Sequence, residues 1–224
     1  DNEANGQVTQ LDDPPTESLN YLVFSPDDSY RLAVASGDTI SILGEQAVGL
    51  YDVPNNRLIT RFSANFWVNG IAFNSEGTQF AWLDRSLHVH DLESDSEILN
   101  VPLQMPLLGA VAFTPDDSTI AYTDQSTIVL ISPDEPEERR VYEAVDGLIP
   151  GKMTFSPDGS LLAVASIPGE GSPGGASVLT IFDVETGDVI IEQELESLWS
   201  LAFSPDGTIL VIAQANDVIF MTVP

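Results

Sequence analysis

The sequence contains no cysteine, a single lysine and only two histidines. Without cysteine there are no disulfides, no thiolate metal sites and no cysteine nucleophile. Two histidines leave few options for a Ser-His-Asp arrangement, and no nucleophile-elbow motif is present. No apolar run approaches the roughly 18 residues that a membrane-spanning helix needs, so we expect no membrane insertion.

Positive charge is also scarce, with 7 Lys+Arg against 35 Asp+Glu and a net charge of −28. A chain this acidic repels phosphate backbones and anionic lipid surfaces, which argues against a nucleic-acid partner. The simplest role of the charge is solubility. Together with the scarcity of lysine and a first residue other than methionine, it favours an extracytoplasmic or secreted protein, with the cytoplasm as the alternative.

One short unit occurs five times, and each copy is a phenylalanine followed by a tight turn. The copies are residues 24–28, 73–77, 113–117, 155–159 and 203–207. The phenylalanines are 49, 40, 42 and 48 residues apart. A Pro-Asp-Gly turn between apolar runs is typical of a β-hairpin, and a period of about 40–50 residues is typical of a propeller blade.

Apolar segments around each turn predict four strands per repeat, here called a to d from the axis outward. Strand a ends at the repeat phenylalanine, and large and small residues alternate before it, as where blades pack face to face. The large residues are Leu22, Ile71, Val111, Met153 and Leu201, and the next column is Val23, Ala72, Ala112, Thr154 and Ala202. We therefore predict one all-β domain over residues 1–224, with residues 1–6 as a disordered tail.

These repeats resemble the WD40-type β-propeller family over nearly the whole chain. The copies are degenerate and look bacterial. Where the family ends strand c in Trp-Asp, this chain has Tyr51-Asp52, His90-Asp91, Ile131-Ser132, Phe182-Asp183 and Met221-Thr222. The family's buried polar network therefore cannot be transferred to this chain. The resemblance implies a five-bladed propeller but no particular function, because such folds host many unrelated roles.

The fifth repeat stops after strand c, whereas residues 7–11 form an unassigned strand at the other end of the chain. We predict that this N-terminal strand completes the last blade and closes the ring. Closure would remove an exposed sheet edge, which otherwise invites aggregation.

Alternating strand directions would put the loops of the repeats on two faces. The a–b and c–d turns form a turn face, and the b–c and d–a connections form a loop face. Long b–c insertions in the first and fourth repeats make the loop face irregular. The insertions span residues 37–46 and 167–176 and are marked by Gly37, Gln46, Gly169 and Gly174. We expect a protein partner to bind the loop face, because binding groups concentrate on loops held by a rigid scaffold.

Further candidate contacts are Phe66 and Trp67 in a d–a connection, Trp199 at the start of a strand a, and the only lysine, Lys152. Trp199 stands in a column otherwise filled by small or polar residues, and aromatic anchors dominate protein interfaces. The alternatives are that Trp67 caps a blade junction and that Lys152 pairs with a carboxylate.

No cofactor or metal site is predicted. His88 and His90 share a face, but spacing reveals no third ligand, and the acidic doublets lack the pattern of a calcium loop. The predicted inner strands carry no Asp or Glu, which argues against a glycosidase with paired carboxylates.

The sequence thus predicts a non-catalytic protein-interaction scaffold. One alternative is a carbohydrate-binding or carbohydrate-cleaving propeller, in which Trp82, Trp199 and Tyr21 would stack on sugars. Another is a structural subunit of an extracellular assembly, including a homo-oligomer.

Overall fold

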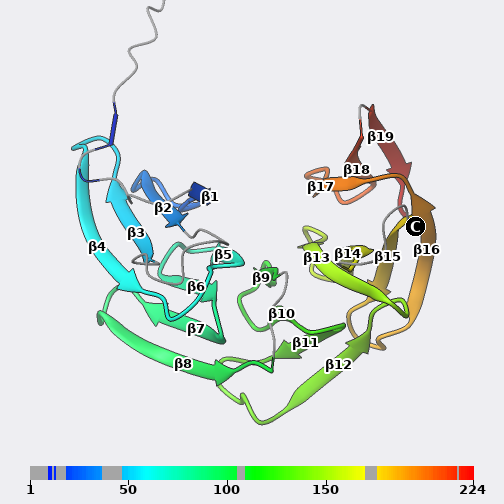
Figure 1. The fold of residues 1–224 in the computed structure, drawn as a ribbon, viewed down its shortest axis with the longest axis horizontal. Helices are drawn as coiled ribbons and strands as arrows, with labels where there is room; N and C mark the ends of the chain where they lie inside the picture. The colour runs from blue at the N-terminus through cyan, green and yellow to red at the C-terminus, as the bar shows by residue number, and fades with distance from the viewer. Residues whose placement is uncertain are drawn as a thin grey trace, which may run out of the picture.

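The computed structural model describes residues 10–11, 13, 19–36, 47–104, 109–169, 176–215 and 217–224. This part of the chain consists of 19 β-strands joined by turns and loops (Figure 1). It contains no helix that could cross a membrane. The all-β prediction is confirmed.

The strands form four antiparallel sheets of four strands and one of three. In every sheet, strands that are consecutive in the chain are hydrogen-bonded neighbours. The first sheet is β1 (Leu19–Phe24), β2 (Arg31–Ser36), β3 (Ala47–Asp52) and β4 (Arg57–Ser63). The second is β5 (Gly70–Phe73), β6 (Gln79–Leu83), β7 (Ser86–Asp91) and β8 (Ser96–Pro102). The third is β9 (Val111–Phe113), β10 (Ile120–Asp124), β11 (Thr127–Ile131) and β12 (Arg139–Glu143).

The fourth sheet is β13 (Leu148–Phe155), β14 (Leu161–Pro168), β15 (Ser177–Asp183) and β16 (Val189–Leu195). The fifth is β17 (Leu198–Phe203), β18 (Ile209–Gln214) and β19 (Asp217–Thr222). In Figure 1 the sheets stand side by side around a common centre, with the first strand of each on the inside and the last on the outside. The arc they form is open between the first and fifth sheets.

The a–b turn is a hydrogen-bonded module that explains why the same short unit recurs. In the fourth sheet, the Asp158 carboxylate accepts hydrogen bonds from the hydroxyls of Ser156 (2.6 Å) and Ser160 (2.8 Å). The Ser156 hydroxyl in turn accepts the N–H of Leu161, at 2.9 Å. Gly159 takes a φ of +75° at the tip of this turn, a conformation that glycine adopts without strain. The same bonds recur in the fifth sheet with Ser204, Asp206, Thr208 and Ile209.

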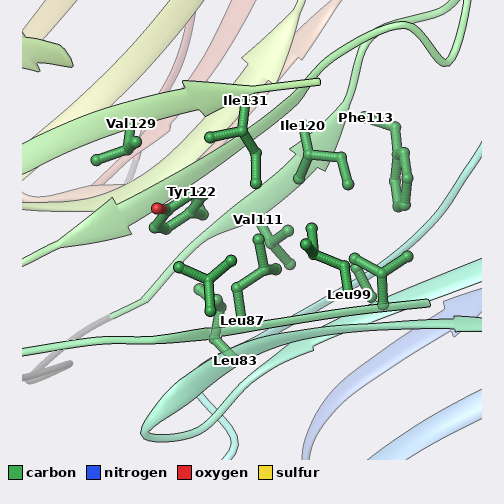
Figure 2. Packing of buried hydrophobic residues seen from close by; sticks show 12 residues of the cluster. Leu83, Leu87, Leu99, Val111, Phe113, Ile120, Tyr122, Val129 and Ile131 are labelled. Atoms are coloured by element: carbon green, nitrogen blue, oxygen red, sulfur yellow. The ribbon is translucent and has the colours of Figure 1, made fainter. Parts of the chain in front are cut away.

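The core lies between the sheets, as four apolar clusters that each join two consecutive sheets. Figure 2 shows the cluster between the second and third sheets, where side chains from both point toward one another. Its labelled members are Leu83, Leu87, Leu99, Val111, Phe113, Ile120, Tyr122, Val129 and Ile131. The predicted columns therefore do pack face to face, with Val111 turned to the preceding sheet and Ala112 to the following one.

Closure of the last sheet by residues 7–11 is not confirmed. Residues 7–9, like the predicted tail, lie outside the described residues, and Gln10 and Leu11 are not in a strand. Asn56 instead donates a hydrogen bond to the carbonyl of Gln10 (3.1 Å). The hydroxyl of Tyr51 donates to the carbonyl of Asp13 (3.0 Å). The described part of the N-terminal segment therefore lies against the first sheet, because that sheet offers donors to its backbone.

Replacing Ser156 with alanine should lower the free energy of unfolding by about 1–3 kcal/mol, because the buried amide of Leu161 loses its acceptor. Urea unfolding followed by circular dichroism would measure the change. Ser160→Ala is the matched control, since it removes an exposed hydroxyl from the same carboxylate, and it should cost less than about 1 kcal/mol. Equal losses in the two variants would contradict this account of the turn.

Candidate functional site

The loop face carries a stacked aromatic pair in the connection between β4 and β5. The rings of Phe66 and Trp67 lie 4.7 Å apart at an interplanar angle of 27°, and both residues are half-buried. The exposed Arg85, in the turn between β6 and β7, places its guanidinium carbon 4.5 Å from the centre of the Phe66 ring. A d–a connection and a b–c turn thus meet on one face, as the alternation of strand direction predicts.

The buried carboxylate of Asp84 ties these two loops together. It accepts the backbone N–H of Asn65 (2.8 Å), which directly precedes the aromatic pair, and that of Ser86 (2.8 Å), which follows Arg85. Burial by itself would raise the pKa of Asp84, but hydrogen bonds from His88 and from these two amides outweigh it and lower the pKa. An ionised carboxylate therefore fixes the aromatic pair relative to the arginine.

His88 links Asp84 to a second carboxylate. Its Nε2 lies 3.0 Å from Asp84 Oδ1 and its Nδ1 lies 2.6 Å from Glu97 Oε1. Its ring stacks on Trp82 at 4.6 Å and 6°. Burial lowers the pKa of His88, but hydrogen bonds to the two carboxylates outweigh burial and raise it. The imidazolium form, with both nitrogens donating, is thus the form that this network favours.

The two histidines do share a face, as predicted, and that face is packed against the first sheet. Phe62 of β4 lies 5.0 Å from the Trp82 ring and 4.8 Å from the His90 ring. The described residues include no group of three or more His, Asp or Glu that could hold a metal ion. Both nitrogens of His88 face carboxylates, and Nε2 of His90 lies 3.1 Å from Asp95 Oδ1.

Lys152 projects from β13 into the centre of the arc. A cavity of about 160 Å³ there is lined by Tyr21, Gly70, Gly109, Lys152 and Met153, among others. The ammonium lies 4.7 Å from the centre of the Tyr21 ring. None of the ion pairs among the described residues involves Lys152, so pairing with a carboxylate is not supported. Desolvation by the surrounding strands lowers the pKa of Lys152.

The other predicted contacts do not join this arrangement. Trp199 is 65 % exposed on the fifth sheet, where the pairing of β17 with β18 shifts register between Leu198 and Ser200. Gly169 follows β14, whose last residues extend the strand ladder into the predicted insertion by pairing Ile167 with Ile149. Gly37, Gln46 and Gly174 lie outside the described residues.

Two of the three proposed sugar-stacking aromatics are unavailable. Trp82 is buried in the cluster between the first and second sheets, and Tyr21 lies under Lys152. Only Trp199 presents an open ring, which weakens the carbohydrate alternative.

Sequence reasoning missed Arg85 and the network of Asp84, His88 and Glu97. The available indication was the position of Asp84 and Arg85 as the two residues between strands b and c of the second repeat. It also missed an apolar cavity of about 380 Å³ at the turn face, lined by four of the repeat phenylalanines: Phe24, Phe73, Phe113 and Phe155.

Replacing His88 with glutamine should destabilise the protein most at about pH 5–6, by roughly 2–3 kcal/mol, because charged hydrogen bonds are lost. The raised pKa of His88 means that its contribution is complete below about pH 6 and is lost as pH rises through the folded-state pKa. The pKa values of Asp84 and Glu97 are lowered, so the stability that these two carboxylates contribute is lost as pH falls through their folded-state pKa values.

Thermal unfolding of both proteins between pH 4 and pH 9 would measure the difference. Glu97→Gln is the matched control, because it removes the outer carboxylate and leaves Asp84 in place, so part of the pH dependence should remain. A difference between wild type and His88→Gln that is the same at every pH would contradict a charged His88.

No family model matches the sequence. Among solved structures, the chain is similar to Hydrazine Synthase from Kuenenia stuttgartiensis, with a TM-score of 0.69 and 17% identity, over 92% of this chain and 57% of that one. It is also similar to the beta-propeller domain of Cps50 (Swd1) from Myceliophteria thermophila, with a TM-score of 0.73 and 15% identity, over 93% of this chain and 66% of that one. The chain therefore spans less than two thirds of the length of either structure. This likeness shows that the sheets adopt a β-propeller arrangement.

Proposed function

We propose that the protein is a non-catalytic scaffold that binds a protein partner on its loop face. The observation that carries the proposal is the stacked Phe66–Trp67 pair with the exposed Arg85 over it. Aromatic side chains, tryptophan above all, and arginine are enriched among the few residues that supply most of the binding energy at protein interfaces. Their position on connections between propeller sheets is one where a partner can reach them.

The site is held in place before any partner arrives. Asp84 fixes both loops by accepting two backbone hydrogen bonds of 2.8 Å. His88 bonds to Asp84 and is itself bonded to Glu97. A preorganised surface loses little conformational entropy on binding, so its contacts contribute more fully to affinity.

The surrounding charge supports a partner with a basic rim. A net charge of −28 speeds the encounter with a positively charged surface and repels anionic ones. This is also the ground for proposing that nucleic acid is not a partner. The same acidic, lysine-poor composition supports an extracytoplasmic location, which we propose with it.

The finer assignment extends the surface from the aromatic pair to the two insertions. In this proposal, the loops marked by Gly37, Gln46, Gly169 and Gly174 enlarge the loop face, and Lys152 and Trp199 contact the partner from strands β13 and β17. The extension of β14 to Pro168 supports it, because a strand ladder would hold the base of the fourth-repeat insertion.

Alanine substitution of Trp67 or Phe66 should weaken partner binding at least tenfold, as expected for an aromatic anchor. The partner would first be identified by carboxylate-reactive cross-linking and mass spectrometry of the native complex, and affinities would then be measured by calorimetry. Tyr30→Ala is the matched control, since Tyr30 is an exposed aromatic in an a–b turn on the turn face. Unchanged affinity in both the Trp67 and Phe66 variants would refute the assignment, and Trp199→Ala tests its extension separately.

A further inference from the structure

The first strands of the sheets surround an axial channel whose two parts differ in chemistry. β1, β5, β9 and β13 stand around the centre of the arc (Figure 1). The cavity of about 380 Å³ lies at the turn-face end of these strands, and we call it the apolar cavity. The cavity of about 160 Å³ that contains Lys152 is called the lysine cavity. Ile71, Val111 and Met153 line both, so the two cavities meet at these three residues.

The apolar cavity has an uncharged wall, although the chain carries 35 acidic and 7 basic residues. None of the described residues that line it is charged, and its apolar wall includes Phe24, Phe73, Phe113 and Phe155. Small-molecule sites are typically apolar cavities of roughly 300–1,000 Å³ with a few polar groups. The apolar cavity therefore has the size and chemistry to take the apolar body of a small molecule.

Three polar side chains in that wall already have hydrogen-bond partners within the protein. Asn74 and Ser75 both donate to the Asp117 carboxylate, at 3.0 and 2.8 Å. The Thr114 hydroxyl donates to the carbonyl of Thr119, at 3.2 Å. A molecule in the apolar cavity leaves these groups satisfied even when it offers no hydrogen bond, and an apolar body therefore suits this wall.

The lysine cavity supplies a single cation that has no counter-ion among the described residues. Lys152 is the only charged residue in the described part of its lining, and none of the ion pairs among the described residues includes it. Its ammonium lies 4.7 Å from the centre of the Tyr21 ring. Desolvation lowers the pKa of Lys152, which is the direction expected for a cation drawn out of water without an anion beside it. An ammonium has three N–H donors, so donors remain for the oxygens of a ligand.

We propose that the centre of the arc binds a small apolar carboxylic acid, with the carboxylate on Lys152 and the apolar body in the apolar cavity. Lys152 and Phe155 are three residues apart on β13. Three residues of strand span roughly 10 Å. The ligand is therefore a molecule of about that length with one charged end, such as an arylalkanoic acid. Every residue that carries the proposal belongs to the first four sheets.

The overall charge of the chain limits the ligand to one negative charge but does not exclude it. The net charge of −28 disfavours anions in general. At physiological salt, however, charges more than about 8 Å apart are largely screened. At short range, an anion in the channel meets Lys152 and an otherwise uncharged described lining. One cation matches one carboxylate, whereas a phosphate group would need further donors and positive charge.

This site is distinct from the aromatic pair that carries the proposed function. Phe66 and Trp67 line neither cavity, so the inference goes beyond that function. The extension of the loop-face proposal gives Lys152 a contact with the protein partner. The two uses of Lys152 can be separated, because only a small molecule in the channel also requires the apolar cavity.

Calorimetric titration of the full chain with phenylbutyrate, phenylbutanol and acetate tests the proposal. Phenylbutyrate should bind roughly tenfold or more tightly than phenylbutanol, which lacks the charge, and than acetate, which lacks the apolar body. Lys152→Met should reduce the affinity for phenylbutyrate to that for phenylbutanol. Because Lys152 is the only lysine, isotope-labelled lysine should give one Cε signal in the NMR spectrum, and phenylbutyrate should shift it. No binding of phenylbutyrate, or equal affinity for phenylbutyrate and phenylbutanol, would overturn the proposal.

A matched pair of aspartate variants tests the role of the uncharged wall. Phe24→Asp should weaken the binding of phenylbutyrate roughly tenfold or more, because it places a carboxylate in the apolar cavity. Phe220→Asp makes the same change on the fifth sheet, away from both cavities, and should leave the affinity unchanged. Both phenylalanines are exposed, so both variants should still fold. Equal effects of the two substitutions would contradict a site in the channel.

Two further comparisons separate this result from the loop face. Phe66→Ala should leave the affinity for phenylbutyrate unchanged, whatever it does to partner binding. A Lys152→Met variant that weakens partner binding but not phenylbutyrate binding would overturn the proposal and assign Lys152 to the partner alone.

Discussion

Apolar contact between consecutive sheets is the interaction on which the rest of the structure depends. Each sheet turns one column of large residues to the sheet before it and another to the sheet after it, so no sheet can bury its core alone. Five sheets meet at four junctions, and each junction has its own cluster. These clusters fix the sheets, and the bonds that Asp84 accepts then position the loops on that framework. Phe66 and Trp67 lie in the connection that leads into β5, whose Ile71 and Phe73 belong to the first junction.

Much of the fold could be predicted because its determinants are local in the sequence. The Ser-Pro-Asp turn builds itself from neighbouring side chains, as Ser156, Asp158 and Ser160 do, and its spacing therefore reports the repeat directly. The position of the N-terminal segment could not be predicted in the same way. It depends on donors far along the chain, such as the Tyr51 hydroxyl and the Asn56 amide, and no periodicity announces such a pairing.

The same distinction between local and long-range determinants applies to the candidate site. The side of the molecule on which Phe66 and Trp67 lie follows from strand alternation, and the sequence was sufficient for it. The cation over Phe66 and the carboxylate beneath the loops require knowing which turn meets which connection. Lys152 shows how composition can mislead: an excess of carboxylates suggests an ion pair, but the ammonium lies over the Tyr21 ring, which lines the same cavity.

The net charge and the exposed apolar columns affect different properties of this protein. The net charge of −28 makes copies of the chain repel one another, while Phe24 and Phe220 remain exposed in the structure. Repulsion does not remove the unfavourable hydration of these side chains, because it acts between molecules and not on the apolar surface itself. The same columns pack against a neighbouring sheet at every internal junction, so among the described residues the two end sheets carry apolar columns that lack such a neighbour. The acidic composition and the exposed apolar columns are therefore compatible features of one chain, because the first acts between molecules and the second acts through the hydration of each molecule.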